Sequence, residues 1–394
     1  MNKRGIGWAL LMAVLLLGIA GAIAEEATDI TKECKITTKI GSKEIKRISD
    51  SKYSSWFSSG TGLKAAINIE LPEGKEAGGI VIKWANASPA IRVQVKDGDG
   101  YKTVATSNTD YLSDYIELPE SITAFRILQE EKAPGRMYIA ELQVFSRGEL
   151  PESVQRWENP WSKADMLVIS THPDDELIFF GGTIPYYTKE MEMAVQVAYV
   201  VPATPERRLE LLDGLWHCGV RHYPVVGNFA DKFSTKMADI QKAWGKNRLD
   251  RFIVALYREF QPEVVIAQDV KGEYGHGAHK AVSDAAQRAV KLAADPKYEK
   301  KTAKQTGTWQ VKKLYLHLYK EGQIRMDWRI PLDAFSGKTA FDIAEEAFLL
   351  HRSQQKGDYF VQDFGPYDNA LFGLYYTNVG ADTKKDDFFE NVFD

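Results

Sequence analysis

Two short motifs combine histidine and aspartate at spacings that suit a metal ion. The first reads THPDDE at residues 171–176, and the second reads GEYGHGAH at residues 272–279. In each motif two potential ligands stand three residues apart, so they can share one face of a first helical turn. Imidazole nitrogens and carboxylate oxygens are common zinc ligands, and these residue types therefore predict chemistry centred on a metal ion. The pairs are His172 and Asp175 in the first motif, and His276 and His279 in the second.

Both motifs directly follow apolar runs, at residues 166–170 and 263–268, which predict buried strands. Open α/β sheets bind ligands beyond the carboxyl ends of their strands, where the strand order reverses. If these two strands are neighbours, His172, Asp175 and His279 supply two nitrogens and one oxygen to one ion. Three protein ligands leave one coordination position for water, which is typical of a catalytic zinc site. Fe²⁺ is the second candidate, because metal availability decides occupancy as much as geometry does.

Asp174 stands between the two potential ligands of the first motif, so it must point elsewhere. It is therefore free to act on a water molecule at the metal. A simpler interpretation is that Asp174 and Asp175 only cap a helix N-terminus. Capping needs one such residue and does not explain the preceding His172 and Pro173, so we favour the metal site.

The region around these motifs alternates strand and helix patterns. Unbroken apolar strands joined by helices predict an α/β fold with a doubly wound, Rossmann-like, mostly parallel sheet. We expect this domain to occupy residues 160–394, with a loosely held acidic tail at residues 382–394. The expected strands are 166–170, 194–201, 223–226, 263–268 and 313–318, and the expected helices are 174–189, 205–218, 236–260 and 279–294.

Residues 160–394 resemble the LmbE-like deacetylase family, which includes the PIG-L enzyme of glycolipid anchor synthesis. The resemblance rests on the THPDDE motif, on RRLE at residues 207–210 and on HRSQ at residues 351–354. It implies that Arg207 contacts substrate, although Arg207 could also belong to a solvated helix face. For His351, a purely structural role is an equally open interpretation. The implied metal ligands are His172, Asp175 and His279, and the implied general base is Asp174.

One departure from the family pattern concerns the second motif. The family has His-Pro-Asp-His where this sequence has His276-Gly277-Ala278-His279. Both histidines are kept, so we expect the ligand set and catalysis to survive. The lost proline and aspartate put the local support of the loop, and with it the choice of substrate, in question.

The resemblance implies a zinc-dependent hydrolase that removes the acetyl group from an N-acetylglucosamine-type sugar or glycan. Asp174 would take a proton from the attacking water and return it to the departing amine. His276 as an imidazolium, or Tyr274, would stabilise the developing oxyanion. Two alternatives stay open: a sugar O-acetyl esterase, and a secreted glycan-binding protein with an inactive enzyme domain. The remaining histidines, His217, His222 and His317, are expected to be ordinary surface or half-buried residues.

Residues 27–148 carry short alternating strand patterns separated by Gly, Asp, Asn and Pro, which predict a β-sandwich. Three segments resemble a discoidin-type, galactose-binding-like module, which implies a glycan-binding role; a purely supporting role is the alternative. We expect the module to be separable from the catalytic domain at a linker near residues 148–151. The three segments are 49–56, 67–72 and 141–146.

Residues 1–24 have the features of a secretory signal peptide: Lys3 and Arg4, a long apolar run and an AIA cleavage pattern at residues 22–24. We therefore expect a secreted or cell-envelope protein, or a membrane-anchored one if the segment is not cleaved. The 50 basic and 54 acidic residues give a net charge of −4, which leaves no basic footprint for nucleic acid. Cys34 and Cys218 fall in different domains and are expected to be unpaired.

Overall fold

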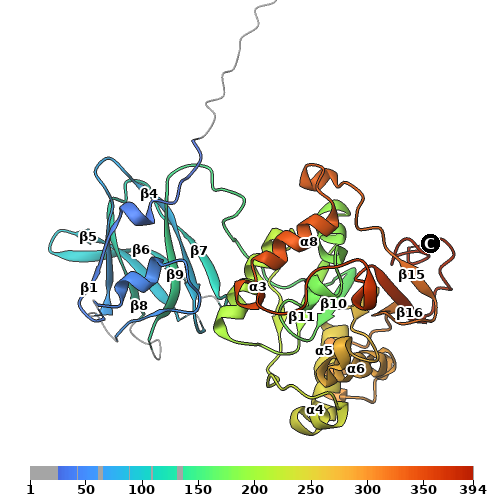
Figure 1. Ribbon diagram of the computed structural model, residues 1–394. Helices are drawn as coiled ribbons and strands as arrows, with labels where there is room; N and C mark the ends of the chain where they lie inside the picture. The colour runs from blue at the N-terminus through green and yellow to red at the C-terminus, as the bar shows by residue number, and fades with distance from the viewer. Residues whose placement is uncertain are drawn as a thin grey trace, which may run out of the picture.

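The computed structural model describes residues 25–41, 43–60, 65–87, 89–107, 110–130 and 136–393, and the predicted signal peptide at residues 1–24 lies outside these ranges. The described residues form a mixed α/β structure with an N-terminal β region, residues 25–146, beside a helix-flanked sheet (Figure 1). Both cysteines are free, as expected. Within the described ranges we find no helix of the length and apolar character that a membrane crossing requires.

The N-terminal β region contains two antiparallel sheets. Strand β3 (Ile67–Glu70) buries alternate residues, and β4 (Ala77–Trp84) buries every residue but Gly78. Buried residues of both strands, and of β8 (Ala124–Gln129) and β9 (Tyr138–Ser146), belong to one hydrophobic cluster. The two sheets therefore enclose a shared core. One sheet has the order β1 (Lys35–Thr38), β3 (Ile67–Glu70), β8 (Ala124–Gln129), β5 (Ile91–Asp97), β6 (Gly100–Ser107). The other has the order β2 (Phe57–Ser58), β9 (Tyr138–Ser146), β4 (Ala77–Trp84), β7 (Ser113–Glu117).

The second region is built on a seven-stranded sheet. Five neighbouring strands are parallel, the sixth is antiparallel to the fifth, and the seventh is antiparallel to the sixth. The chain runs outward from β10 (Met166–Ser170) on one side and returns to β13 (Val264–Ala267) on the other, so the strand order reverses between these neighbours. The order is β12 (Val225–Val226), β11 (Val195–Tyr199), β10 (Met166–Ser170), β13 (Val264–Ala267), β14 (Lys313–His317), β16 (Leu371–Thr377), β15 (Gln323–Arg325).

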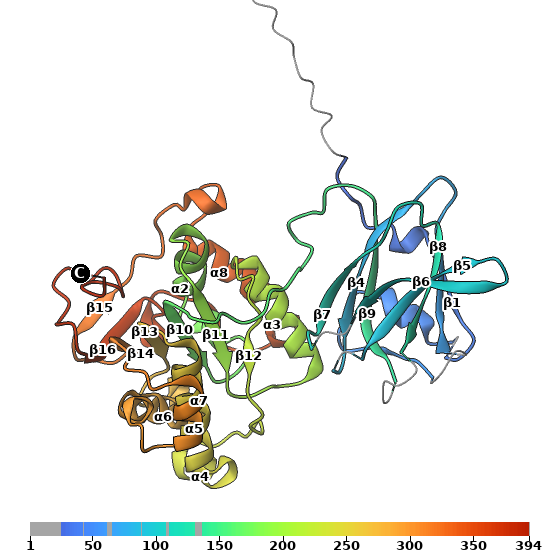
Figure 2. The same ribbon diagram turned by 180° about the vertical axis from the view of Figure 1, so that it is seen from behind.

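Helices cover both faces of this sheet (Figure 2). Val168 of β10 packs in the cluster that contains α3 (Pro205–His217) and α8 (Ala340–Leu349), whereas its neighbours Leu167 and Ile169 pack with α5 and α6. Side chains of alternate strand residues thus serve opposite layers. The other α-helices are α1 (Asp175–Ile178), α2 (Thr183–Pro185), α4 (Met237–Trp244), α5 (Lys246–Phe260), α6 (Gly277–Ala294) and α7 (Lys300–Thr306). Shorter turns are η1 (Thr31–Glu33), η2 (Ile45–Ser49), η4 (Tyr186–Glu190), η5 (Glu273–Gly275), η6 (Asp333–Phe335), η7 (Arg352–Gln354) and η8 (Gly365–Tyr367).

Two predicted helices are each interrupted in the structure, so their prediction as continuous helices was wrong. The helix expected at 174–189 is broken into α1, α2 and a π turn, because Gly181 adopts a φ of 52° and lies against the Asn369 side chain. A Cβ at Gly181 would lie 2.5 Å from that side chain. The helix expected at 236–260 is divided into α4 and α5 at Gly245, whose φ is 76°.

The loosely held tail expected at 382–394 is also wrong for the described residues to 393. Asp382 is buried and accepts hydrogen bonds from Lys313 and Tyr315 of β14. Phe388 is fully buried, and its backbone N–H donates to the Tyr187 hydroxyl at 3.0 Å. Aromatic burial and these polar contacts therefore hold the C-terminal segment on the sheet.

Candidate active site

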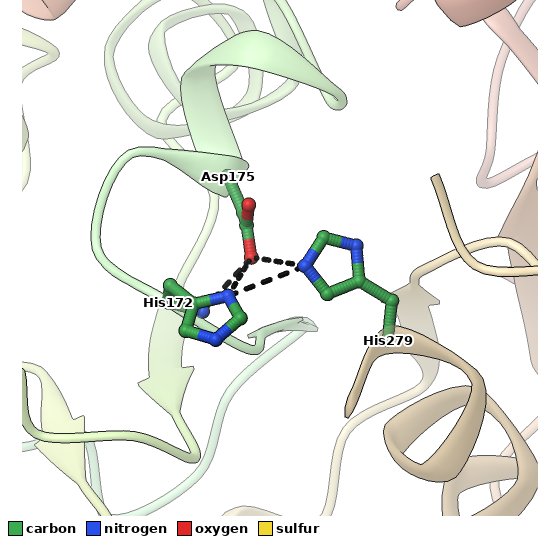
Figure 3. Close-up of side chains that lie close together, drawn as sticks. All are labelled: His172, Asp175 and His279. Atoms are coloured by element: carbon green, nitrogen blue, oxygen red, sulfur yellow. Dashed lines mark hydrogen bonds and ion pairs between the residues drawn. The ribbon is translucent and has the colours of Figure 1, made fainter. Parts of the chain in front are cut away.

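The three predicted ligands meet where the strand order reverses. His172 and Asp175 follow β10, and His279 lies in the first turn of α6, which follows β13. His172 Nδ1 is 3.0 Å from Asp175 Oδ2, His279 Nε2 is 3.2 Å from the same oxygen, and the two nitrogens are 3.2 Å apart (Figure 3). All three side chains are buried.

This arrangement fits a metal ion. Zinc ligands at about 2.0–2.1 Å in a tetrahedron stand about 3.3 Å from one another, close to the separations observed here. The donor set of two imidazole nitrogens and one carboxylate oxygen suits Zn²⁺ and also Fe²⁺. Among the described residues, this trio is the group of His, Cys, Asp and Glu side chains whose donor atoms converge closely enough for one ion.

A buried carboxylate orients the His279 ring from behind. Glu273 Oε2 lies 2.8 Å from His279 Nδ1, and Glu273 Oε1 lies 2.7 Å from His317 Nδ1. Although burial opposes ionisation, hydrogen bonds with His279 and His317 lower the pKa of Glu273 to about 2. The ionised carboxylate can thus fix the ring that faces the ion, as carboxylates commonly do behind metal-bound histidines.

Sequence reasoning missed these two supporting residues. The expectation that His317 is an ordinary surface or half-buried residue is wrong, because its side chain is fully buried and contacts Glu273. The signal was its position at the end of an apolar strand, since parallel strands end at one edge of the sheet. Gln268 was also missed; its amide donates to Asp175 Oδ2 at 3.0 Å.

Asp174 lies beside the ligand cluster without joining it. Its backbone adopts a φ of 100°, and its N–H donates to Glu176 Oε2 at 2.9 Å. No side-chain capping hydrogen bond is found for Asp174 at α1, which argues against the capping interpretation. Burial, and then the charge on Asp175, raises the pKa of Asp174 to about 8. A strained backbone and a perturbed carboxyl at one position are features of catalytic residues.

Arg207 reaches Asp174 from the first turn of α3. Its guanidinium donates to Asp174 Oδ1 at 3.1 Å and to the Pro173 carbonyl at 2.7 Å. Both side chains line a cavity of about 230 Å³ above the ligand cluster. Arg207 therefore does not lie on a solvated helix face, which was the alternative interpretation. The cavity is lined by His172, Asp174, Asp175, Ile178, Phe179, Arg207, Asp231, Phe233, Tyr274, His276, Gln354 and Tyr359.

His276 and Tyr274 both face this cavity. His276 Nδ1 accepts a hydrogen bond from the Ala278 N–H at 3.0 Å, so the other ring nitrogen is the available donor. Burial, and then the neighbouring His279, lowers the pKa of His276 to about 3. The hydrogen bond and the lowered pKa both favour a neutral His276 ring, whereas the sequence analysis expected an imidazolium as one of two possible donors. Burial also raises the pKa of Tyr274, so its hydroxyl stays a neutral donor.

The departure at Gly277 has a structural reason. The Gly277 N–H donates to the Ser234 carbonyl at 2.6 Å, and a Cβ at this position would lie 2.7 Å from that oxygen. Proline would have neither the donor nor the room. The close approach brings the segment 231–236 to the cavity, where Asp231 lies 3.7 Å from His172 Nε2 and the Phe233 ring lies 5.1 Å from the His276 ring. Sequence reasoning did not single out Asp231 or Phe233.

The other histidines lie outside the ligand cluster. His351 is fully buried, and its Nε2 is 3.8 Å from Glu176 Oε1. His217 and His222 do not line the cavity; they contact Glu346 and the Asn159 carbonyl. These two agree with the expectation of ordinary histidines.

Comparisons with known proteins identify similar sequences for the region that carries the site. Residues 167–290 match the family model "PIG-L: GlcNAc-PI de-N-acetylase". The chain is similar to 1D-myo-inositol 2-acetamido-2-deoxy-alpha-D-glucopyranoside deacetylase 1 of Catenulispora acidiphila, at 29% identity over 40% of this chain and 56% of that protein. It is 30% identical to the corresponding deacetylase of Geodermatophilus obscurus, over 38% of this chain and 60% of that one. The chain thus spans less than two thirds of the length of these curated relatives.

Solved structures include similar proteins as well. The N,N'-diacetylchitobiose deacetylase from Pyrococcus horikoshii is 21% identical, with a TM-score of 0.37 over 52% of this chain and 75% of that one.

Proposed function

We propose that this protein is a metal-dependent hydrolase that removes the acetyl group from an N-acetylglucosamine-type amino sugar. The observation that carries the proposal is one buried cluster of three converging donor atoms with the carboxyl of Asp174 beside it, outside the ligand set. The names of the matched family and of the two curated relatives, which are deacetylases of N-acetylated amino sugars, support the choice of reaction and substrate class.

His172, Asp175 and His279 would hold the ion, and we propose zinc, with Fe²⁺ as the alternative. When bound, the ion supplies a water of lowered pKa and polarises the acetyl carbonyl. The protein supplies the proton transfers. Asp174 accepts the proton of the attacking water and delivers it to the amine nitrogen as the C–N bond breaks, which leaves acetate and a free amino sugar.

The cavity residues around Asp174 have separate tasks in this mechanism. Arg207 fixes the orientation of the Asp174 carboxyl and presents the rest of its guanidinium to the substrate. The His276 ring nitrogen and the Tyr274 hydroxyl donate hydrogen bonds to the carbonyl oxygen as negative charge develops there. A well-placed donor of this kind contributes about 3–4 kcal/mol to transition-state stabilisation.

The two alternatives from the sequence analysis make different predictions. A sugar O-acetyl esterase would use the same residues but would not need a proton on its leaving group. A glycan-binding protein with an inactive enzyme domain would have no use for an oriented ligand set, and the Glu273 support of His279 therefore favours an enzyme.

The site of action and the N-terminal region complete the proposal. We propose that the protein acts outside the cytoplasm, because of the signal-peptide features of residues 1–24. We also propose that the N-terminal β region is a discoidin-like sandwich that supports binding of a glycan. N-terminal sequencing of the protein from its native source should begin near Glu25, and intact protein in the cytosol would contradict export.

Acetate release from matched N-acetylated and O-acetylated sugars tests the central proposal. The purified protein is freed of metal, reconstituted with Zn²⁺ or Fe²⁺ and assayed with each sugar. We expect release from the N-acetyl substrates, abolished by a chelator and restored by the ion. Release from O-acetyl sugars alone would favour the esterase, and no release from any sugar with either metal would contradict the proposal.

A further inference from the structure

Helix α3 extends from the active-site cavity to the N-terminal β region. Arg207, Glu210 and Asp213 stand three residues apart along this helix, so each is a surface neighbour of the next. The first and last are separated by six residues, or about 9 Å along the helix axis. Each makes a specific contact: Arg207 in the cavity, Glu210 with a neighbouring turn, and Asp213 with the N-terminal β region.

The Asp213 end of α3 is held by a buried polar cluster. Lys83 of β4 places its Nζ 2.5 Å from Asp213 Oδ1, and the Tyr53 hydroxyl donates to Asp213 Oδ2 at 2.7 Å. The Gln155 amide donates to Asp213 Oδ1 at 2.6 Å. The Lys83 and Asp213 side chains are only 10% and 15% exposed, so the pair is largely removed from water. Removing one partner of such a pair is costly, since it leaves the other charge buried and uncompensated.

The middle of α3 contacts η7, a turn that contributes to the lining of the active-site cavity. Glu210 accepts hydrogen bonds from the Ser353 N–H at 2.8 Å and from its hydroxyl at 2.5 Å. The next residue, Gln354, lines the cavity, and the preceding Arg352 donates to the Ser51 carbonyl of the N-terminal β region at 3.3 Å. Both Arg207 and Gln354 are thus connected to the N-terminal β region through α3 and η7.

The interface beside the ion pair is not filled by side chains. A cavity of about 390 Å³ lies there, lined by residues of both regions that include Tyr53, Lys83, Asp213, Trp216 and Arg352. Leu212 and Leu215 of α3 are buried in the hydrophobic core, but the void beside Asp213 leaves groups at this interface without apolar contact partners. The polar contacts of Asp213 therefore connect this end of the helix to the N-terminal β region where apolar packing does not.

We infer that Lys83 and Tyr53 are positioning residues of the active site, which act on Arg207 through Asp213 and α3. The N-terminal β region is accordingly part of the substrate-binding apparatus and not a freely separable module, in contrast to the expectation from the linker. The inference rests on the proposed deacetylase function for its kinetic test, and a second test needs no substrate.

Steady-state kinetics of Lys83→Met in the full chain tests the positioning role. We expect KM for the N-acetyl sugar to rise about 2- to 30-fold, the range of couplings carried by packed elements, with kcat little changed. Lys35→Met is the matched control: Lys35 forms an ion pair with Glu70 in the same region, but both side chains are exposed. The control should leave KM unchanged.

A double-mutant cycle and amide hydrogen exchange separate positioning from general destabilisation. Lys83→Met combined with Asp213→Asn should raise KM no further than either change alone, because both act through one contact. Exchange along α3 should quicken in Lys83→Met and not in Lys35→Met. If Lys83→Met does not fold, Tyr53→Phe, which removes one hydroxyl from the same cluster, takes its place in every measurement.

Each outcome decides between the two ideas. Unchanged KM together with unchanged exchange in the folded variant would overturn the positioning role. Faster exchange in α3 with no acetate release from any N-acetyl sugar by the parent protein would overturn the proposed function and still support the physical link from Lys83 to α3.

Discussion

The surroundings of two adjacent aspartates, Asp174 and Asp175, shift their pKa values in opposite directions. Although Asp175 is buried, His279 and His172 hold the pKa of its carboxyl well below the usual range. Burial and the charge of Asp175 raise the pKa of Asp174 to about 8, against the opposing effect of Arg207. One carboxyl is thus suited to bind a cation and the other to exchange a proton near neutral pH. Cation binding and proton exchange therefore belong to two different residues, Asp175 and Asp174.

Substituting each aspartate should separate the two roles. Asp175→Ala should lose metal and activity together, because it removes a ligand. Asp174→Asn, nearly the same size, should retain the metal and lose turnover by about 10²- to 10⁴-fold, the range for general acid–base catalysis. Metal content and acetate release are measured for each variant. An Asp174→Asn protein with full activity would remove Asp174 from the mechanism.

Glu273 provides a test of the second layer around the ion. Glu273→Gln keeps the shape of the side chain but removes the negative charge that orients His279. We expect metal affinity to fall about 10- to 100-fold, as for other carboxylates behind metal-bound histidines. Glu263→Gln is the control, since Glu263 is also buried, at 8% exposure, but pairs with Lys163 and Lys312 instead. Equal affinity in both variants, measured by competition with a chelator, would argue against the role of Glu273.

At the scale of elements, local sequence patterns predicted strands and helices, whereas contacts between residues far apart in the sequence could not be predicted. The apolar run 166–170 predicted β10 to the residue, because a strand buried on both faces has an unmistakable composition. The breaks at Gly181 and Gly245 could not be predicted, since each depends on a positive φ that tertiary contacts select. The pairing of Glu273 with His317 was equally invisible, as it joins residues 44 positions apart.

The segment 231–236 owes its place to Gly277, and a side chain there should displace it. Gly277→Ala would put a Cβ 2.7 Å from the Ser234 carbonyl and 2.8 Å from that of Lys236. We expect a loss of about 1–3 kcal/mol in the free energy of unfolding, with a raised KM as Asp231 and Phe233 move. Gly100→Ala is the control, because the nearest atom to its Cβ would be 3.6 Å away. Equal stability of the two variants in urea denaturation would contradict this account.

At the scale of the whole molecule, the interface between the two regions should make stability depend on pH. Burial raises the pKa of Glu141 on β9 from 4.5 to about 7, and its carboxylate accepts the Ser51 N–H at 3.0 Å. Between these pH values the unfolded chain has released a proton that the folded chain keeps. The contribution of Glu141 to stability therefore falls as pH rises through this window.

Glu141→Gln should remove that contribution. We expect the variant to gain stability relative to the parent protein as pH increases from 5 to 8, measured by urea denaturation at both pH values. The comparison between the two proteins cancels the other titrating groups that they share. A constant difference across this pH range would show that Glu141 titrates normally.

Because the ligand cluster is assembled from two distant parts of the chain, metal binding and folding depend on each other. His172 and His279 are 107 residues apart in sequence and meet only when β10 and β13 pair. An unfolded chain offers no such site, so a bound ion stabilises the native state alone, by about 2.7 kcal/mol when free metal exceeds the dissociation constant 100-fold. Chelation should lower the melting temperature of the parent protein and leave that of Asp175→Ala unchanged. Metal supply would then govern how long the molecule resists proteases as well as how fast it works.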